Sequence, residues 1–196
     1  MNRYRFIQKN DNININNNKL LSIGRISPVK NIEILIEAVN ILLEKDFNFS
    51  LNIYGDVLKK DKKYFKKIKK LAINLTENKK IIFNSPIANF QTPKIYNKYN
   101  LFINLTTSGS FDKTILEAMA CKSLVLVCNK SLGDNFPKNF LFKENNAKDL
   151  ADKIIKIFSL SNEELKSYSN KFRQYVVDNH SLKLLSNKIK INLKNL

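Results

Sequence analysis

Short apolar runs that alternate with amphipathic segments constrain this chain more than any other feature of its sequence. The runs lie at residues 20–23, 51–54, 81–83, 101–105, 124–127 and 140–142. Most of them are apolar throughout, which is typical of strands buried on both faces of a parallel sheet. Parallel strands need crossover connections, and the longer segments between the runs can supply these as helices. The sequence therefore predicts an α/β fold, a Rossmann-like doubly wound parallel sheet.

The segments between the runs carry apolar side chains every three or four residues, as one face of a helix does. Residues 31–45 show this spacing, and so do residues 64–75, where Tyr64, Ile68, Leu71, Ala72 and Leu75 would share one face. Thr92 followed by Pro93 is typical of an N-cap before a short helix that ends near Tyr99. Further helices are predicted at residues 113–121, 148–159, 162–178 and 181–194.

Length and composition favour one domain with a loose arm at its start. The 196 residues suit a single globular unit, and residues 1–18, which end in an Asn-rich stretch, show no periodicity. We expect a flexible arm over 1–18, a Rossmann-like domain over 19–180 and a final helix over 181–196. Without a signal-like N-terminus or an apolar run of roughly 18–20 residues, a cytoplasmic chain is expected.

Cysteine and histidine usage excludes a zinc site. Cys121 and Cys128 show no metal-ligand spacing, and His180 is the only histidine in the sequence. We interpret His180 as a capping or packing residue and not as a catalytic base. No metal and no resident cofactor are expected.

The formal net charge of +17 comes almost entirely from lysine, because only four of the 34 basic residues are arginine. Lysine, asparagine and isoleucine are all abundant, so one interpretation is codon bias that fills solvated faces. A second is peripheral contact with an anionic membrane. No nucleic-acid partner is expected. Nucleic-acid-binding modules usually interleave basic residues with aromatics or use arginine for base contacts, whereas the basic residues here are mostly lysine. The densest run, residues 59–70, predicts one helix with a lysine-rich outer face.

The first candidate binding segment follows the first predicted strand. Gly24 permits a tight exit from the strand, and Pro28 stiffens the loop before the next helix. Arg25 and Lys30 then stand near a helix N-terminus, where anions are favoured. A guanidinium and an ammonium together suit a diphosphate. The alternative is a solvated turn, but Arg25 is one of few arginines in a lysine-rich chain.

The second candidate segment begins in the polar loop after the run at 101–105. Glu117 is the single acid in an otherwise small or apolar stretch, residues 114–121. A carboxylate there needs hydrogen-bond donors, and the two hydroxyls of a ribose would supply them. The alternative is a local pair with Lys113, four residues earlier. Gly109 and Ser110 leave backbone N–H groups open for phosphate or sugar oxygens.

At these two segments the sequence resembles the C-terminal donor-binding domain of the family-4 glycosyltransferases (glycosyl transferases group 1), which have the GT-B fold. Residues 21–25 with Pro28 and Lys30 are similar to the family's Gly-Arg-x-x-Pro-x-Lys loop. Residues 116–121 are similar to its Leu-Glu-Ala-Met-Ala helix. The resemblance runs from about residue 19 to the last helix. It implies a single domain equivalent to the C-terminal half of such an enzyme.

The resemblance implies transfer of a hexose-type sugar from a nucleotide-sugar to a glycan or lipid-linked acceptor, with retention of anomeric configuration. UDP-sugars are the expected donors, ahead of GDP-mannose. Arg25 and Lys30 would be the catalytic groups on the diphosphate, and Glu117 would bind the ribose. The other implied donor-binding residues are Gly24 in the loop after the first strand, Asn84 and Ser85 beside the base, and Gly109, Ser110, Phe111, Asp112 and Lys113 near the sugar and phosphates.

Two departures from the family pattern matter. Gly109 occupies the position of the family's first glutamate, so Asp112 and Lys113 are the candidates for steadying the donor sugar. At 196 residues the chain is also expected to lack the family's N-terminal acceptor domain, so a separate acceptor-binding domain is an expected partner, and the helix over 181–196 would pack toward it. The alternative function is a nucleotide-sugar-binding remnant or regulatory module without turnover, and a less favoured one, based on charge alone, is a basic nucleic-acid-binding domain.

Overall fold

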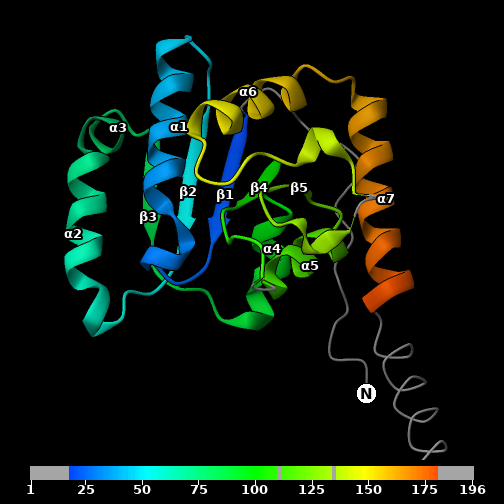
Figure 1. Ribbon diagram of the computed structural model, residues 1–196, viewed down its shortest axis with the longest axis horizontal. Coiled ribbons are helices and arrows are strands. Elements are labelled where there is room, and N and C mark those ends of the chain that lie inside the picture. Colours follow the sequence, from blue (N-terminus) through cyan, green and yellow to red (C-terminus); the bar gives the residue numbers. More distant parts are fainter. Residues whose placement is uncertain (1–17, 110–111, 134–135, 181–196) are drawn as a thin grey trace, which may run out of the picture.

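A parallel sheet forms the centre of the chain, as the apolar runs predict. The computed structural model describes residues 18–109, 112–133 and 136–180. Its strands are β1 (Lys19–Ile23), β2 (Ser50–Tyr54), β3 (Ile81–Asn84), β4 (Leu101–Asn104) and β5 (Leu124–Val127). They pair in parallel in the order β3-β2-β1-β4-β5 (Figure 1). The fold is therefore the predicted α/β, Rossmann-like one.

Helices cover both faces of this sheet because the connections from β1 to β3 run one way along it and the connection from β4 to β5 runs the other way, so crossovers of one hand lie on opposite faces. One group consists of α1 (Ile32–Glu44), α2 (Lys62–Leu71), α3 (Ile73–Glu77) and α6 (Ala147–Phe158). The other consists of α4 (Thr92–Tyr96), α5 (Lys113–Ala120) and α7 (Asn162–His180). In Figure 1, α1 lies in front of the sheet, packs against α6 and has α2 beside it.

The apolar strand residues form the core between these layers. Leu20 pairs with Leu51 on one side and with Leu101 on the other, and all three are fully buried. Strand β4 is buried at every position, including its last residue, Asn104. A polar side chain at the end of a buried strand needs partners, and the candidate site below supplies them.

The predicted sixth strand at 140–142 is wrong. Only Leu141 pairs with the sheet, through an isolated parallel bridge to Val127. The preceding residues form a 3-10 turn in which the Phe140 N–H donates to the Pro137 carbonyl at 2.9 Å. Because the Phe140 N–H is bonded within this turn, it is not available to pair with β5. The segment therefore forms a single bridge at the edge of the sheet and not a strand.

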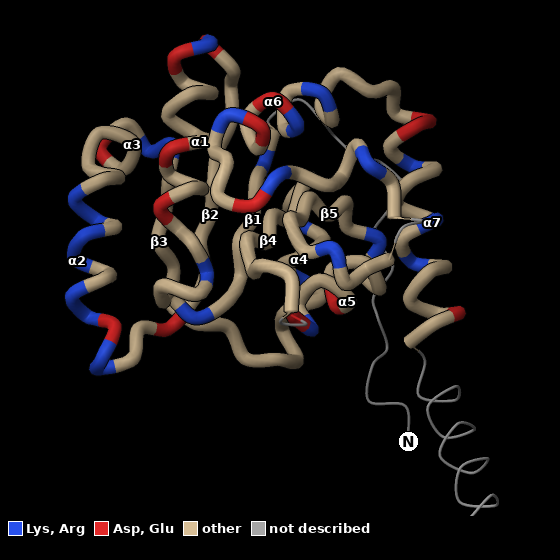
Figure 2. The backbone as a smooth tube through the Cα atoms, viewed as in Figure 1, with Lys and Arg blue, Asp and Glu red and all other residues tan. Residues whose placement is uncertain are grey.

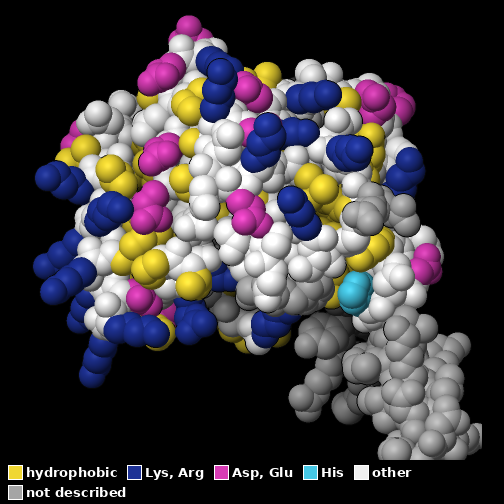
Figure 3. Space-filling model, in the orientation of Figure 1, with side chains coloured by type: hydrophobic (Ala, Val, Ile, Leu, Met, Phe, Trp, Pro, Cys, Tyr) yellow, Lys and Arg dark blue, Asp and Glu magenta, His cyan; other side chains and the backbone are white. Residues whose placement is uncertain are grey.

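The single helix predicted over 59–70 is also divided. Residues Lys59–Asp61 form a 3-10 turn, α2 follows, and the helix breaks at Ala72, whose φ of −95° and ψ of 7° lie outside the helical range. Leu71 was expected to face the core but is 45% exposed. The lysine-rich outer face is as predicted, with basic residues along α2 in Figure 2 and projecting side chains at the left edge of Figure 3.

Thr92 begins α4 as a helical residue, whereas the sequence predicted an N-cap. Its hydroxyl donates to the Asn89 carbonyl at 2.8 Å, and Gln91 occupies the N-cap position. A 3-10 turn over Asn89–Gln91 leads directly into the helix and displaces the cap by one residue. Pro93 still lies within the first turn, where its missing N–H costs nothing.

Candidate functional site

The candidate site lies between the carboxyl ends of β1 and β4. These strands are neighbours, but the chain leaves β1 toward β2 and leaves β4 toward β5. Such a reversal opens a crevice in which open α/β sheets bind ligands. The two segments that the sequence singled out, the loop after β1 and the start of α5, meet at this point.

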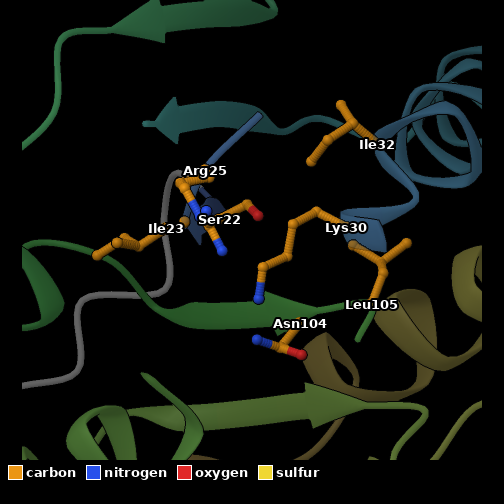
Figure 4. Close-up of a pocket in the computed structure, with 8 residues that line it drawn as sticks. Ser22, Ile23, Arg25, Lys30, Ile32, Asn104 and Leu105 are labelled. Carbon is orange, nitrogen blue, oxygen red and sulfur yellow. The ribbon is translucent and has the colours of Figure 1, made fainter. Parts of the chain in front are cut away.

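A small pocket at this crevice is lined by residues of β1, the loop after it and the end of β4. The lining residues are Ser22, Ile23, Gly24, Arg25, Lys30, Ile32, Asn104 and Leu105. Figure 4 shows the Lys30 side chain reaching toward Asn104, with the Arg25 side chain across from it beside Ser22. The enclosed space is about 10 Å³, enough for one water or one oxygen atom of a ligand. A nucleotide would therefore have to lie over this pocket and insert only an oxygen.

Close contact between two glycines fixes the loop after β1. A Cβ on Gly55 would lie 2.0 Å from the Gly24 carbonyl oxygen, so no other residue fits there. Gly24 itself has a φ of +151°, a conformation that favours glycine. Its N–H donates to the Tyr54 carbonyl at 3.0 Å, which ties the loop to the end of β2. Arg25 is thereby placed on a rigid stretch of backbone.

Asp112 is the centre of a hydrogen-bond network beneath the pocket. Its carboxylate forms an ion pair with Lys30. The same carboxylate accepts hydrogen bonds from Asn104 Nδ2 at 2.8 Å and from Thr106 Oγ1 at 3.0 Å. It also caps α5 by accepting from the Thr114 N–H at 3.1 Å. Asp112 therefore joins the loop after β1 to the end of β4 and the start of α5.

The network keeps Asp112 ionised. Burial alone would raise the pKa of this carboxyl, which is only 8% exposed. Hydrogen bonds from Lys30 and Asn104, together with the charge of Lys30, outweigh burial and lower the pKa to about 2. The Lys30 ammonium donates to Thr106 Oγ1 at 3.0 Å as well, so its position is set from two sides.

Glu117 lies one turn further along α5, half-buried beside Tyr96. Tyr96 Oη donates to the Glu117 carboxylate at 3.5 Å, a long hydrogen bond, and to the Thr114 carbonyl at 3.3 Å. Burial raises the pKa of Glu117, and the charge of Asp112 adds to this, against opposing effects of Lys113 and Tyr96. Asp112 is thus an electrostatic neighbour of both Glu117 and Lys30.

The remaining predicted residues are distributed around the rim. Lys113 is exposed, and no ion pair among the described residues joins it to Glu117. Gly109 has a φ of +91° with open space around it, whereas Ser110 and Phe111 lie outside the described residues. Asn84 donates to Asn52 at 3.0 Å at the end of β3, two strands away from β1, and Ser85 beside it is exposed. These two share the edge of the sheet with the pocket but do not line it.

Sequence reasoning missed the polar residues that support the network. Asn104 and Thr106 were interpreted as part of a strand and a loop, and Tyr96 as part of a short helix. Asn104 gave a usable signal, because it is the one amide within the apolar run 101–105. Glu144 gave none, although its carboxylate accepts from the Ser108 N–H at 2.8 Å and holds the loop before Gly109.

The cysteines and the histidine lie outside the site's chemistry. Cys121 and Cys128 are buried, and burial raises the pKa of each thiol to about 12. The His180 ring lies 5.5 Å from the Tyr175 ring, a packing contact. In the described ranges, no group of three His, Cys, Asp or Glu side chains could hold a metal ion. Nor is any helix in those ranges long and apolar enough to span a bilayer.

Comparison with known proteins identifies the family. The model of the family described as glycosyl transferases group 1 matches residues 4–176. Poly(ribitol-phosphate) alpha-N-acetylglucosaminyltransferase of Staphylococcus aureus is 24% identical over 167 residues, which are 81% of this chain and 32% of that protein. The chain therefore spans about a third of that relative's length.

Solved structures show the same fold. The C-terminal domain of LpcC, a glycosyl transferase group 1 protein of Francisella tularensis, is 22% identical with a TM-score of 0.69, covering 85% of this chain and 88% of that one. Anabaena HepE in complex with UDP is 20% identical with a TM-score of 0.81, covering 92% of this chain and 50% of that one. The chain belongs to the group 1 glycosyl transferases, and its described part has the fold of their C-terminal GT-B domain.

Proposed function

We propose that this chain binds the nucleotide-sugar donor of a retaining glycosyltransferase, which transfers a hexose-type sugar to a glycan or lipid-linked acceptor. The carrying observation is that Arg25 and Lys30 converge on one pocket at the β1–β4 crevice. A UDP-sugar is the proposed donor, ahead of GDP-mannose. HepE was solved with UDP, which supports this choice.

Lys30 and Arg25 would stabilise the leaving diphosphate. An ammonium has three N–H donors, and Asp112 and Thr106 take two of those on Lys30. One donor remains for a phosphate oxygen. Arg25 is exposed and makes no hydrogen bond or ion pair with any described residue, so its guanidinium is available to the same diphosphate. Fixed positive charge beside the departing diphosphate lowers the barrier to sugar transfer.

Glu117 would accept hydrogen bonds from the ribose. It is half-buried, and its hydrogen bond from Tyr96 is long, so the carboxylate has acceptor capacity left. The alternative local pair with Lys113 lacks a direct contact, which favours the diol interpretation. We propose that Asp112 acts on Lys30 and not on the sugar, because its oxygens already accept from four side chains and one backbone N–H. Lys113, exposed beside the loop, then remains the candidate for the donor sugar.

A second domain would complete the acceptor side. Val29 and Phe90 are 67% and 81% exposed, and both lie in segments that follow the carboxyl ends of strands. Large apolar side chains at that edge suit contact with another domain across the donor cleft. The S. aureus relative acts on poly(ribitol-phosphate), which supports a glycan acceptor. A cytoplasmic location remains a proposal.

Nucleotide titration tests the proposal directly. We expect UDP, measured by calorimetry, to bind the full chain, and Arg25→Ala to weaken binding at least about tenfold through the lost charge-assisted hydrogen bonds. Lys148→Ala is the matched control, because Lys148 is an exposed lysine on α6, away from the crevice. Equal binding by the wild-type and Arg25→Ala chains, or no binding of UDP or GDP, would contradict the proposal. Hydrolysis of labelled UDP-sugar separates an enzyme from a binding module.

A further inference from the structure

The outer surface of α2 concentrates positive charge beyond what composition explains. Eight of the twelve residues from 59 to 70 are lysine, against 30 lysines in all 196 residues. All eight side chains are exposed, and the one acid in this stretch, Asp61, is buried at 8% exposure. Codon bias alone would spread lysine evenly along the sequence. The local excess on this one helix therefore needs another explanation. We propose that this surface docks on an anionic lipid bilayer.

We call this the α2 surface; it comprises Lys59, Lys60, Lys62, Lys63, Lys66, Lys67, Lys69 and Lys70, with Leu71 and Ile73 at one end. Few of its lysines are neutralised within the protein. Lys67 lies 3.5 Å from Glu33, which is the only ion pair that the surface makes with a described residue. Lys69 lies over the Phe65 ring at 4.8 Å. The other charges face solvent, where an anionic surface can collect them.

The inner face of α2 holds the lysines outward on a fixed support. Ile68 is fully buried, and the Phe65 ring packs edge-on against Phe83 of β3 at 5.7 Å between centroids. Tyr64 Oη accepts from the Ile32 N–H at 3.0 Å and donates to Glu33, which anchors α2 to the start of α1. The charges are therefore presented on a rigid helix, and their spacing does not have to form on binding.

Leu71 and Ile73 favour a bilayer over a nucleic acid. Leu71, the last residue of α2, is 45% exposed, and Ile73, the first residue of α3, is 52% exposed, close after Lys69 and Lys70. Basic side chains next to exposed aliphatic ones suit the boundary between headgroups and acyl chains. A polyanion in water gives aliphatic side chains no apolar environment, and the only aromatic rings in α2, Tyr64 and Phe65, face inward.

Vesicle binding tests this surface independently of the donor site. We expect the full chain to bind vesicles containing about one-third phosphatidylglycerol, with no binding to pure phosphatidylcholine. Replacing Lys62, Lys63, Lys66 and Lys70 by glutamine should weaken binding at least about 100-fold, since each lysine near an anionic membrane contributes about a fivefold factor. The control replaces Lys138, Lys143, Lys148 and Lys156, four exposed lysines elsewhere, and lowers the net charge equally. Equal losses in both variants would overturn the proposal, because net charge alone would then explain binding.

Leu71→Ser with Ile73→Ser separates a bilayer from a polyanion. We expect this pair to reduce vesicle binding several-fold at raised salt while leaving duplex DNA binding unchanged. Tighter binding to DNA than to anionic vesicles at the same salt, lost in the four-lysine variant, would overturn the bilayer in favour of a nucleic-acid surface. UDP binding should not change in any of these variants, so a failed donor proposal and a failed membrane proposal give different results.

Discussion

Lys30 and the lysines of the α2 surface carry the same ammonium group in opposite surroundings. Lys30 is 21% exposed, forms an ion pair with a buried carboxylate and donates to Thr106. The α2 lysines are exposed, and Lys67 alone pairs with a described carboxylate. A lysine held by a buried network acts at one point, so its replacement should have a large and specific effect. Exposed lysines act by their sum, so a single replacement should have a small one.

Asp112→Ala should give the largest change in stability. The substitution leaves Lys30 without its buried carboxylate and removes the cap of α5, so we expect a loss of about 3 kcal/mol in the free energy of unfolding. Urea unfolding measures it. Asp112→Asn is the control, because the amide oxygen can still cap the helix, and its loss should be smaller. If Asp112→Ala is neutral, the network does not hold the two loops together.

Acid should reveal the same carboxylate. The pKa of the Asp112 carboxyl is about 2 in the folded chain, against 3.8 for an ordinary aspartate such as that of the unfolded chain. Folding therefore favours the ionised form. That stability is complete above about pH 5 and is lost as pH falls through 2, which amounts to about 2 kcal/mol. We expect the difference in unfolding free energy between wild type and Asp112→Asn to shrink over this interval. A difference that is constant with pH would assign it to packing and not to charge.

The position of Glu117 leads us to expect a pH effect on ligand affinity and not on the stability of the fold. Burial raises the pKa of its carboxyl, and the protonated form accepts hydrogen bonds from a diol poorly. UDP affinity should therefore fall several-fold as pH drops through this raised pKa. Calorimetric titrations of wild type and Glu117→Gln against pH check this. The glutamine variant should bind more weakly and lose that component of the pH dependence; parallel profiles would remove Glu117 from the ribose site.

The smallest effect is expected on α2. Lys66→Gln removes one exposed charge that pairs with no described carboxylate, so the free energy of unfolding should change by less than about 0.5 kcal/mol. Thermal unfolding and UDP titration together measure this. A loss comparable to that of Asp112→Ala would mean that exposed and buried lysines do not differ in the way the structure indicates.

Much of the fold could be predicted because its signals are local. The runs at 20–23, 51–54 and 124–127 became strands, since an apolar run in a lysine-rich chain has only the core to occupy. The wrong sixth strand at 140–142 contains the same residue types. There the Phe140 N–H donates to the Pro137 carbonyl in a turn and is not available to a neighbouring strand. An apolar pattern does not show which of these two hydrogen bonds forms.

For the site as well, features local in the sequence could be predicted and contacts between distant residues could not. Arg25 and Lys30 could be singled out from the sequence because they share a loop with Gly24 and Pro28, and the structure places both at one pocket. The network under them could not be, because Lys30 and Asp112 are 82 residues apart and meet only through the pairing of β1 with β4. Asp112 was therefore named, with Lys113, as a candidate for steadying the sugar, and nothing in the sequence indicated its contact with Lys30. Its role in the reaction remains a prediction.

The bond between Lys30 and Asp112 has a consequence for how related sequences can diverge. A neutral residue at position 112 leaves the partly buried Lys30 cation unpaired, and a neutral residue at position 30 leaves the buried Asp112 anion unpaired. Either change alone therefore lowers the stability of the fold. The two positions are therefore expected to covary: lineages that keep this carboxylate should keep the lysine, and those that lose one should replace the other soon after.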